Sequence, residues 1–172
     1  MADNLPAALP SMPQPNFLLS TKLSMPALQQ RHVVRARIQN KLIGNGLPPL
    51  SVVCAPAGFG KTTALVCCLG ASQLPVAWLA LDESDNDPDR FLEYLIGALQ
   101  SVIPDVGCTI LQRLNAPSPP KTLGFLPGLI NELHACPSAF VLVLDDYHLI
   151  NTNEVHQLVY CWSVRHLPCI SQ

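Results

Sequence analysis

The eight residues Ala55–Thr62, with the sequence APAGFGKT, combine two glycines, a lysine and a hydroxyl side chain. They lie between an apolar run rich in β-branched residues, 50–55, and a segment, 61–69, that we interpret as a helix. Gly58 and Gly60 allow the tight turn in which successive backbone N–H groups point into one hollow around a phosphate. The amino end of the following helix adds partial positive charge. This pattern predicts a phosphate-binding loop, with alanine in place of the usual first glycine.

The side chains of this loop have distinct expected roles toward a nucleotide. Lys61 can reach the β- and γ-phosphates, and the Thr62 hydroxyl can coordinate Mg²⁺. A glycine-containing strand–helix turn without a ligand is the alternative, which the sequence Gly-Lys-Thr-Thr in this setting disfavours. The predicted phosphate-contacting residues are Ala57, Gly58, Phe59, Gly60, Lys61, Thr62 and Thr63.

Two aspartates, Asp145 and Asp146, follow the most strand-like segment of the chain, 139–144. A carboxylate at the carboxyl end of a buried parallel strand lies near the crevice where ligands bind. We expect Asp145 to hold Mg²⁺ through water, and Asp146 to orient or deprotonate an attacking water if hydrolysis occurs. Asp146 and Lys61 are therefore the predicted catalytic residues. The alternative is that the two aspartates cap the next segment, but neighbouring carboxylates repel each other and a metal ion would relieve that repulsion.

Strands that alternate with helices predict an α/β fold in which a parallel sheet is covered on both faces. The expected strands are 50–55, 75–81 and 139–144, all buried, and the expected helices are 61–69, one that Asp87 caps and Pro88 begins and that stops before Pro104, 122–135 and 153–164. We expect residues 82–87 to be an acidic loop in which Asp82 and Glu83 are solvated. Residues 1–16 read as a flexible leader, 17–46 as an N-terminal arm that starts extended and becomes helical, and 47–172 as a partial core.

Composition excludes several classes of protein. The 172 residues carry a formal net charge of −2, only 13% are charged, and the mean hydropathy is +0.28. Without clustered positive charge, direct binding to DNA or to an anionic membrane is not expected. The sequence shows no signal peptide and no apolar run of about 18 residues. The seven cysteines include no Cys-x-x-Cys pair and suit reduced thiols, so we expect a cytoplasmic protein. A zinc site at Cys161, His166 and Cys169 is disfavoured because a fourth ligand is lacking.

Six segments together, in order and spacing, carry a resemblance to a known family. They are Leu19–Pro26 (LSTKLSMP), Val34–Ile38 (VRARI), Val53–Thr63 (VCAPAGFGKTT), Val76–Phe91 (VAWLALDESDNDPDRF), Leu129–Leu133 (LINEL) and Val141–Ile150 (VLVLDDYHLI). The chain resembles the N-terminal ATP-binding module of the large MalT-like, LuxR-type transcription activators, a branch of the STAND ATPases. The resemblance implies the three-layer P-loop NTPase fold, with 55–62 as the Walker A motif and 140–146 as the Walker B motif.

The resemblance also implies a function and roles for particular residues. It implies binding of ATP or ADP with Mg²⁺, and switching of an activator between closed and assembled states by nucleotide exchange and inducer binding. Lys61, Thr62, Asp145 and Asp146 take the family's phosphate, magnesium and water roles. Arg35, in the arm, is placed near the nucleotide base, although a solvated helix face is the simpler reading of Arg35.

Members of the family continue well beyond the region that this chain resembles. They have a further strand ending in a sensor arginine, then a winged helix, a helical repeat region and a C-terminal helix-turn-helix. We expect none of these after Pro168, so the fold would be incomplete at its C-terminus. Because that further strand lies between the phosphate-loop strand and the acidic strand, we expect a gap at the centre of the sheet or direct pairing of its two neighbours. The parent protein would bind an inducer, self-associate and bind DNA.

Three functions remain open from the sequence. The first is a regulatory module that binds ATP or ADP with Mg²⁺ and is a weak ATP hydrolase at most. The second is a non-catalytic remnant of a truncated reading frame. The third is a P-loop kinase acting on a small molecule, which would need a lid carrying arginine. Between Asp82 and Lys121 the chain offers only Arg90 and Arg113 for that purpose.

Overall fold

The computed structural model describes residues 18–27, 50–56, 58–117, 121–163 and 169–171. Arg35 and Ala57, both predicted ligand contacts, and the expected helical part of the arm lie outside these residues. The strands are β1 (Leu50–Val52), β2 (Val76–Ala80), β3 (Val141–Asp145) and β4 (Cys169–Ser171). The α-helices are α2 (Lys61–Ala71), α3 (Pro88–Gln100), α4 (Cys108–Leu114), α5 (Leu126–His134) and α6 (Asn153–Ser163). Short 3₁₀ helices are η1 (Ser20–Leu23), η2 (Glu83–Asn86), η3 (Thr122–Phe125) and η4 (Tyr147–Leu149).

The strands form one parallel sheet in the order β1-β4-β3-β2, which confirms the α/β class with a parallel sheet. The expectation that no further strand follows Pro168 was wrong. Neither the gap at the centre of the sheet nor direct pairing of β1 with β3 occurs, because β4 lies between them. Ile170 of β4 pairs with Ser51 of β1 on one side and with Val143 of β3 on the other. Three residues are enough to fill this position, because the backbone N–H and C=O groups of β4 pair with β1 on one side and β3 on the other. Without β4, the facing backbone groups of β1 and β3 would have no partners in the sheet.

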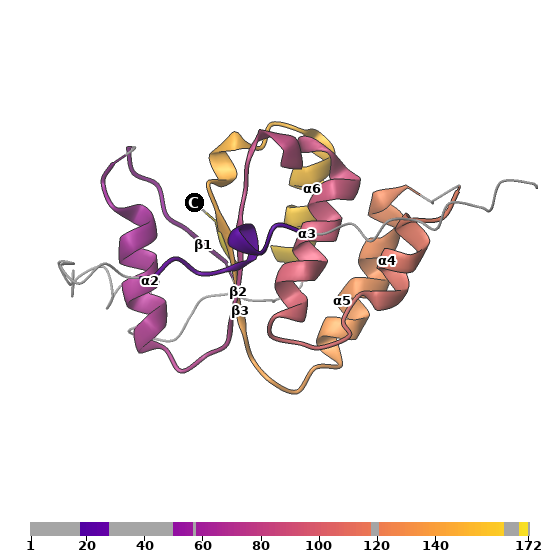
Figure 1. Ribbon diagram of the computed structural model, residues 1–172, viewed down its shortest axis with the longest axis horizontal. Coiled ribbons are helices and arrows are strands. Elements are labelled where there is room, and N and C mark those ends of the chain that lie inside the picture. Colours follow the sequence, from indigo (N-terminus) through magenta and orange to yellow (C-terminus); the bar gives the residue numbers. More distant parts are fainter. Residues whose placement is uncertain (1–17, 28–49, 57, 118–120, 164–168, 172) are drawn as a thin grey trace, which may run out of the picture.

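Two apolar layers cover the sheet, one on each face (Figure 1). On one face, Trp78, Val141 and Val143 pack against Leu65 and Leu69 of α2. On the other face, the alternate residues of β2 and β3 pack against a larger cluster contributed by α3, α4, α5 and α6. Every residue of β3 is buried, as expected for a central strand of a sheet covered on both sides. No helix among the described segments is both long and apolar enough to cross a bilayer.

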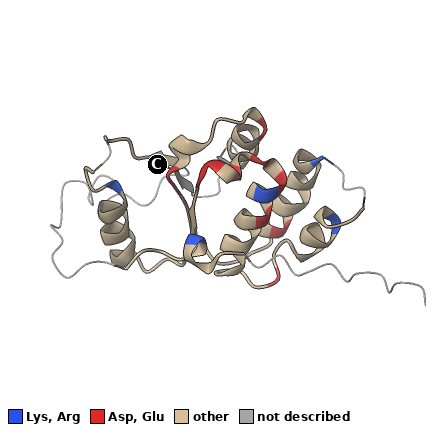
Figure 2. Ribbon diagram, turned by 45° about the horizontal axis from the view of Figure 1, so that its top comes forward, with Lys and Arg blue, Asp and Glu red and all other residues tan. Residues whose placement is uncertain are grey.

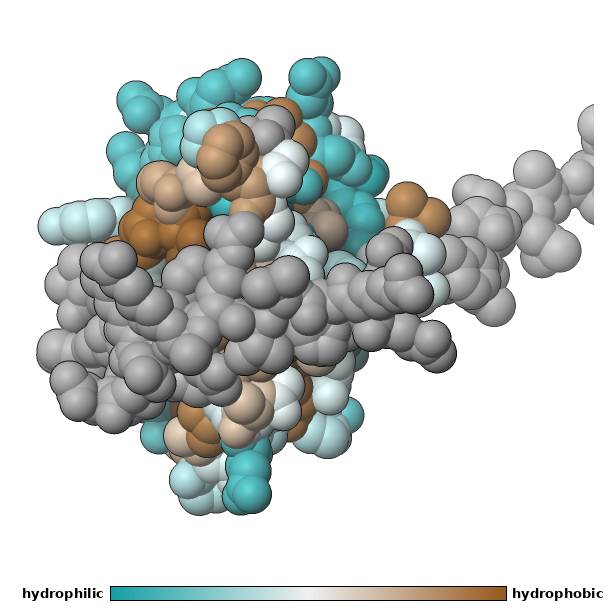
Figure 3. Space-filling view, turned by 90° about the vertical axis from the view of Figure 1, so that its left-hand side faces the viewer, coloured by the Kyte–Doolittle hydropathy of each residue, from teal (hydrophilic) through white to brown (hydrophobic). Residues whose placement is uncertain are grey.

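β1 differs from the buried six-residue strand that we expected. It has only three residues and lies at an edge of the sheet, where Leu50 is 41% and Val52 is 61% exposed. An apolar run alone does not distinguish an edge strand from a central one, so the sequence could not show this. Figure 3 views the molecule from the α2 side and shows apolar surface among hydrophilic residues there.

The helices follow local signals where these are strong. Asp87 caps α3, accepting hydrogen bonds from the N–H groups of Asp89 and Arg90 at 3.0 Å, and Pro88 is its first residue, as predicted. The expected helix over 122–135 is instead η3 followed by α5, with Pro127 in the first turn of α5, where a missing N–H is tolerated. We did not predict α4, which has seven residues and no side-chain cap.

Candidate functional site

The chain between β1 and α2 forms the turn that the glycines predicted. Gly58 and Gly60 have φ values of +79° and +73°, in the left-handed region that favours glycine. The Phe59 N–H donates to the Pro56 carbonyl at 3.4 Å, and the Ala64 N–H donates to the Gly60 carbonyl at 2.9 Å as α2 begins. Among the described residues, no side chain caps α2, so the N–H groups of its first turn have no side-chain acceptor.

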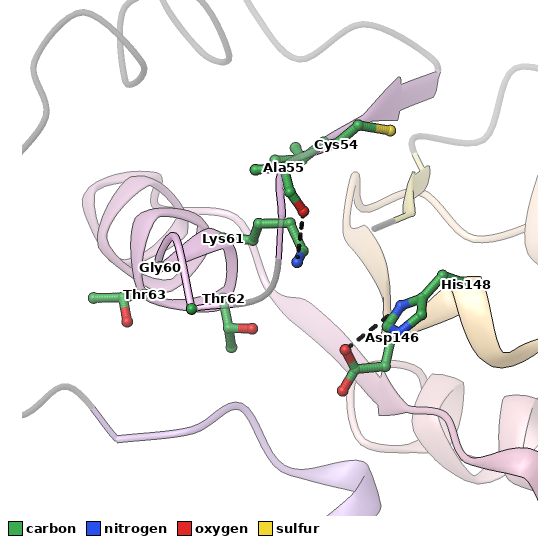
Figure 4. Close-up of a pocket in the computed structure, with 10 residues that line it drawn as sticks. Cys54, Ala55, Gly60, Lys61, Thr62, Thr63, Asp146 and His148 are labelled. Carbon is green, nitrogen blue, oxygen red and sulfur yellow. Dashed lines mark hydrogen bonds and ion pairs between the residues drawn. The ribbon is translucent and has the colours of Figure 1, made fainter.

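A pocket of about 800 Å³ opens at this turn (Figure 4). The turn and the first residues of α2 form one wall, and the segment that follows β3 contributes Asp146 and His148 from across the space. The described residues that line it are Val53, Cys54, Ala55, Gly58, Gly60, Lys61, Thr62, Thr63, Asp146 and His148.

The polar groups of the pocket are held by short local contacts. The Lys61 ammonium donates to the Ala55 carbonyl at 3.1 Å. The His148 Nδ1 atom lies 3.9 Å from the Asp146 Oδ1 atom, and both side chains are at least half exposed. Asp146 itself has a φ of +58°, which is unusual for a residue other than glycine. The positive end of this pocket therefore lies on the turn, and the negative end lies at the end of β3.

Asp145 contacts Thr62 of the pocket wall and is only 4% exposed. The Thr62 hydroxyl is 3.3 Å from both of its carboxylate oxygens, and the Asp146 N–H donates to its Oδ1 atom at 3.0 Å. Burial and the negative charge of Asp146 raise the pKa of Asp145, while the Thr62 hydroxyl, the Asp146 N–H and Lys61 oppose this rise. A hydroxyl and a carboxylate are hard oxygen ligands of the kind that Mg²⁺ takes, and a cation would stabilise the charged carboxylate. The pair formed by Thr62 and Asp145 thus fits the predicted metal site.

The predicted site residues are therefore largely brought together. Gly58, Gly60, Lys61, Thr62, Thr63 and Asp146 line one pocket, and Asp145 joins it through Thr62. Phe59 does not line the pocket and is 59% exposed. Cys54 and His148 were not among the predicted site residues. His148 follows the acidic pair in the sequence, and its Nδ1 atom lies beyond hydrogen-bond distance of the Asp146 carboxylate.

A second polar cluster, centred on Asp85, was missed entirely. The ammonium group of Lys22, in η1, contacts the carboxylates of Asp85 and Asp82, the latter at 3.0 Å. Arg90 lies 3.5 Å from the other oxygen of Asp85, and both cations lie over the Tyr94 ring. Asp85 is fully buried and Lys22 is 8% exposed. Asp82 is half exposed and Glu83 is exposed, as expected, but the segment expected to be a loop forms η2 and buries Asp85.

Asp82, Glu83 and Asp85 follow β2, and Asp145 and Asp146 lie at the end of β3, so several acidic residues meet at the carboxyl end of these two strands; Figure 2 shows them together with others on the helices. The Ser84 hydroxyl, with help from Lys22, lowers the pKa of Asp82 to about 2. Local sequence patterns could not predict the contact between Lys22 and Asp85, because the two residues are 63 positions apart in the chain.

The zinc site that we considered at Cys161, His166 and Cys169 includes His166, which lies outside the described residues. Among the residues that the structure does describe, no three His, Cys, Asp or Glu side chains form a metal-binding group.

Comparison with known proteins gives one consistent result. No protein-family model matches the chain. Over 153 residues, or 88% of the chain, it is 37% identical to the HTH-type transcriptional regulator MalT of Cronobacter sakazakii, 36% to that of Yersinia enterocolitica and 38% to that of Serratia proteamaculans. The aligned region spans 17% of the length of each of these relatives. Over most of its length, this chain is a MalT-like sequence, homologous to a segment of those HTH-type transcriptional regulators.

Proposed function

We propose that this chain is a nucleotide-binding regulatory module that takes ATP or ADP together with Mg²⁺ in the pocket between the 53–63 turn and Asp146. The observation that carries the proposal is the convergence of two sequence-distant segments on one space. Lys61 and Thr62 come from the turn, Asp145 and Asp146 come from the end of β3, and Thr62 and Asp145 are in contact at 3.3 Å. The parallel sheet with this turn after its first strand also supports the P-loop NTPase fold as the class.

The chain's own groups account for how a triphosphate would be bound. The left-handed glycines and the start of α2 present N–H groups to phosphate oxygens, and Lys61 adds a full positive charge at the same wall. Thr62 and Asp145 would hold Mg²⁺, which supplies charge neutralisation between phosphate oxygens. Asp146, on the facing wall, would orient a water molecule. We propose weak ATP hydrolysis at most.

A small-molecule kinase is the weaker candidate. Its lid would need arginine, and the two arginines between Asp82 and Lys121 are both engaged in packing. Arg90 pairs with Asp85 and lies over Tyr94, and Arg113 lies over the ring of Phe125. The remnant without nucleotide binding is an outcome of the test below.

In a longer MalT-like protein, we propose that this module exchanges nucleotide while other parts of the protein bind an inducer, self-associate and bind DNA. The relatives' name, HTH-type transcriptional regulator, supports the last of these for the parent protein. The chain itself is not proposed to bind DNA, because its net charge is −2.

The test is a titration with a fluorescent ATP analogue, with and without Mg²⁺. We expect saturable binding that Mg²⁺ strengthens and that Lys61→Ala weakens by at least about 10-fold, since a charge-assisted contact is worth about 1.5–3 kcal/mol. Lys121→Ala is the matched control, because Lys121 is an exposed lysine outside the pocket. Equal affinity in wild type and Lys61→Ala, or no binding by a folded wild type, would exclude the proposed function and leave the remnant.

A further inference from the structure

The short helix η2, between β2 and α3, contacts two segments that are far from it in sequence. On one side, Asp85 binds Lys22 of the N-terminal segment. On the other side, Asn86 binds the chain that follows η4. η2 is therefore a connector between the N-terminal segment and the part of the chain that carries Asp146.

The side chain of Asn86 is half-buried and its amide is used fully. Its Nδ2 group donates to the carbonyls of Leu149 at 3.0 Å and Glu83 at 3.1 Å. Its Oδ1 atom accepts from the N–H groups of Asn151 at 2.7 Å and Thr152 at 3.1 Å. The Thr152 hydroxyl is shared between Oδ1 and the Asn86 carbonyl, at 3.0 and 2.8 Å. The Asn86 side chain thus binds two N–H donors, of Asn151 and Thr152, and one carbonyl acceptor, of Leu149.

This segment closes the turn that begins at Asp146. The Leu149 N–H donates to the Asp146 carbonyl at 3.0 Å, and the Leu149 carbonyl on the far side of the turn accepts from Asn86. The left-handed backbone of Asp146 is unfavourable for a residue other than glycine and persists only where the surroundings hold it. Asn86 supplies such a constraint from outside the turn.

Asn86 is itself fixed relative to β3. The Leu81 N–H, just before η2, donates to the Asp145 carbonyl at 3.0 Å, and the Asp85 carboxylate accepts from the Asp82 N–H at 2.8 Å. The buried contact of Asp85 with Lys22 holds the same turn from the opposite side. Because η2 is held on both sides, its Asn86 side chain can keep residues 149–152 in a fixed position relative to β3.

We propose that Asn86 is a positioning residue for Asp146, acting through residues 149–152. This inference rests on the proposed function, because it concerns where Asp146 stands against a bound nucleotide. Among the described residues, neither Lys61 nor the turn at 58–60 forms a hydrogen bond with Asn86, so phosphate binding should not depend on it. Loss of Asn86 should therefore change turnover and leave affinity nearly intact.

The experiment compares Asn86→Ala, Asn86→Asp and wild type by steady-state phosphate release with ATP and Mg²⁺, and by fluorescent-ATP titration. We expect Asn86→Ala to lower kcat by about 10- to 100-fold, the effect of misplacing a reacting group by about 1 Å, with KM and Kd within about 2-fold. Asn86→Asp keeps the acceptor for Asn151 and Thr152 and loses the donor to Leu149, so its kcat should fall between the two.

Asn115→Ala is the matched control, since the Asn115 amide donates a local bond to the Leu111 carbonyl at 2.9 Å, at the end of α4 and away from the pocket. Should Asn86→Ala not fold by thermal melting, Asn86→Asp and Thr152→Val decide the question, because each removes only part of the contact. A loss of kcat/KM that lies in KM, or an equal loss in Asn115→Ala, would overturn the positioning role. A wild type that binds the nucleotide without releasing phosphate would also overturn it and leave the proposed function standing. A wild type that does not bind overturns both.

Discussion

At the level of single residues, burial of the charged Asp145 side chain lowers the stability of the fold, while the proposed Mg²⁺ binding requires that charge. Its carboxylate is 4% exposed and adjacent to Asp146, and both conditions raise its pKa. The folded state then holds a proton more tightly than the unfolded state does. Stability falls as pH rises from about 4, the pKa of an unfolded aspartate, through the folded pKa of Asp145, and at neutral pH the charged form is a net cost.

Asp145→Asn should therefore stabilise the protein at pH 7, and should abolish the stabilisation by Mg²⁺ with nucleotide. The gain should shrink below pH 4, where both side chains are uncharged. Thermal melting of the two proteins between pH 3.5 and 7.5, with and without Mg²⁺ and ATP, measures both effects. A variant that is less stable than wild type at pH 7 would show that burial does not dominate at Asp145.

At the level of elements, the N-terminal segment is attached to α3 by both charge and packing. The Leu19 N–H donates to the Tyr94 hydroxyl at 3.4 Å, and Lys22 lies over the Tyr94 ring. Gly97 provides the space for this approach, since a Cβ atom there would lie 2.5 Å from the side chain of Leu18. The attachment depends most on Lys22, because its removal would leave Asp85 buried with only Arg90 as a cationic partner.

Lys22→Met should lower the free energy of unfolding by about 3–5 kcal/mol, the usual effect of removing one partner from a buried ion pair. Urea unfolding at pH 7 measures this loss, with Lys121→Met as the control at an exposed lysine. The double variant Lys22→Met/Asp85→Asn should recover part of this loss. A loss below about 1 kcal/mol in Lys22→Met would mean that the cluster is hydrated in solution.

The pKa of Asp82 is about 2, below the ordinary 3.8, so the stabilisation that Asp82 contributes is present above about pH 4 and is lost as pH falls toward 2.

At the level of the whole molecule, the sheet is continuous only because of three residues. β4 pairs with β1 along one side and with β3 along the other, and no other described strand joins β1, which precedes the glycine turn, to the acidic end of β3. The distance between the two walls of the pocket thus depends on this short strand as well as on the packing of α2.

Ile170→Pro removes one backbone donor from this central strand and should destabilise the protein by at least about 1–3 kcal/mol, with a parallel loss of nucleotide affinity. Ile170→Val keeps the donor and is the control. Urea unfolding and fluorescent-ATP titration on the same samples give both numbers. Unchanged stability in Ile170→Pro would show that β4 contributes little to the folded state.

The local part of this architecture was predictable from the sequence, and the long-range part was not. The glycine turn at 58–60, the cap at Asp87 and the strand that ends at Asp145 each depend on neighbouring residues, and all were predicted within a few positions. Lys22 and Asp85 meet from positions 63 apart, and the edge position of β1 depends on which strands lie beside it. Such features are determined by tertiary packing, which periodicity does not report.

Each of the two apolar layers contains its own tryptophan, so fluorescence can report on each layer separately. The chain has two tryptophans, and one belongs to each layer: Trp78 packs with α2, and Trp162 packs with the helices of the opposite face. They are 1% and 2% exposed, so the emission of each shifts to longer wavelength only when its own layer admits water. Single-tryptophan variants would therefore turn the protein's intrinsic fluorescence into two independent gauges of melting, one for each side of the sheet.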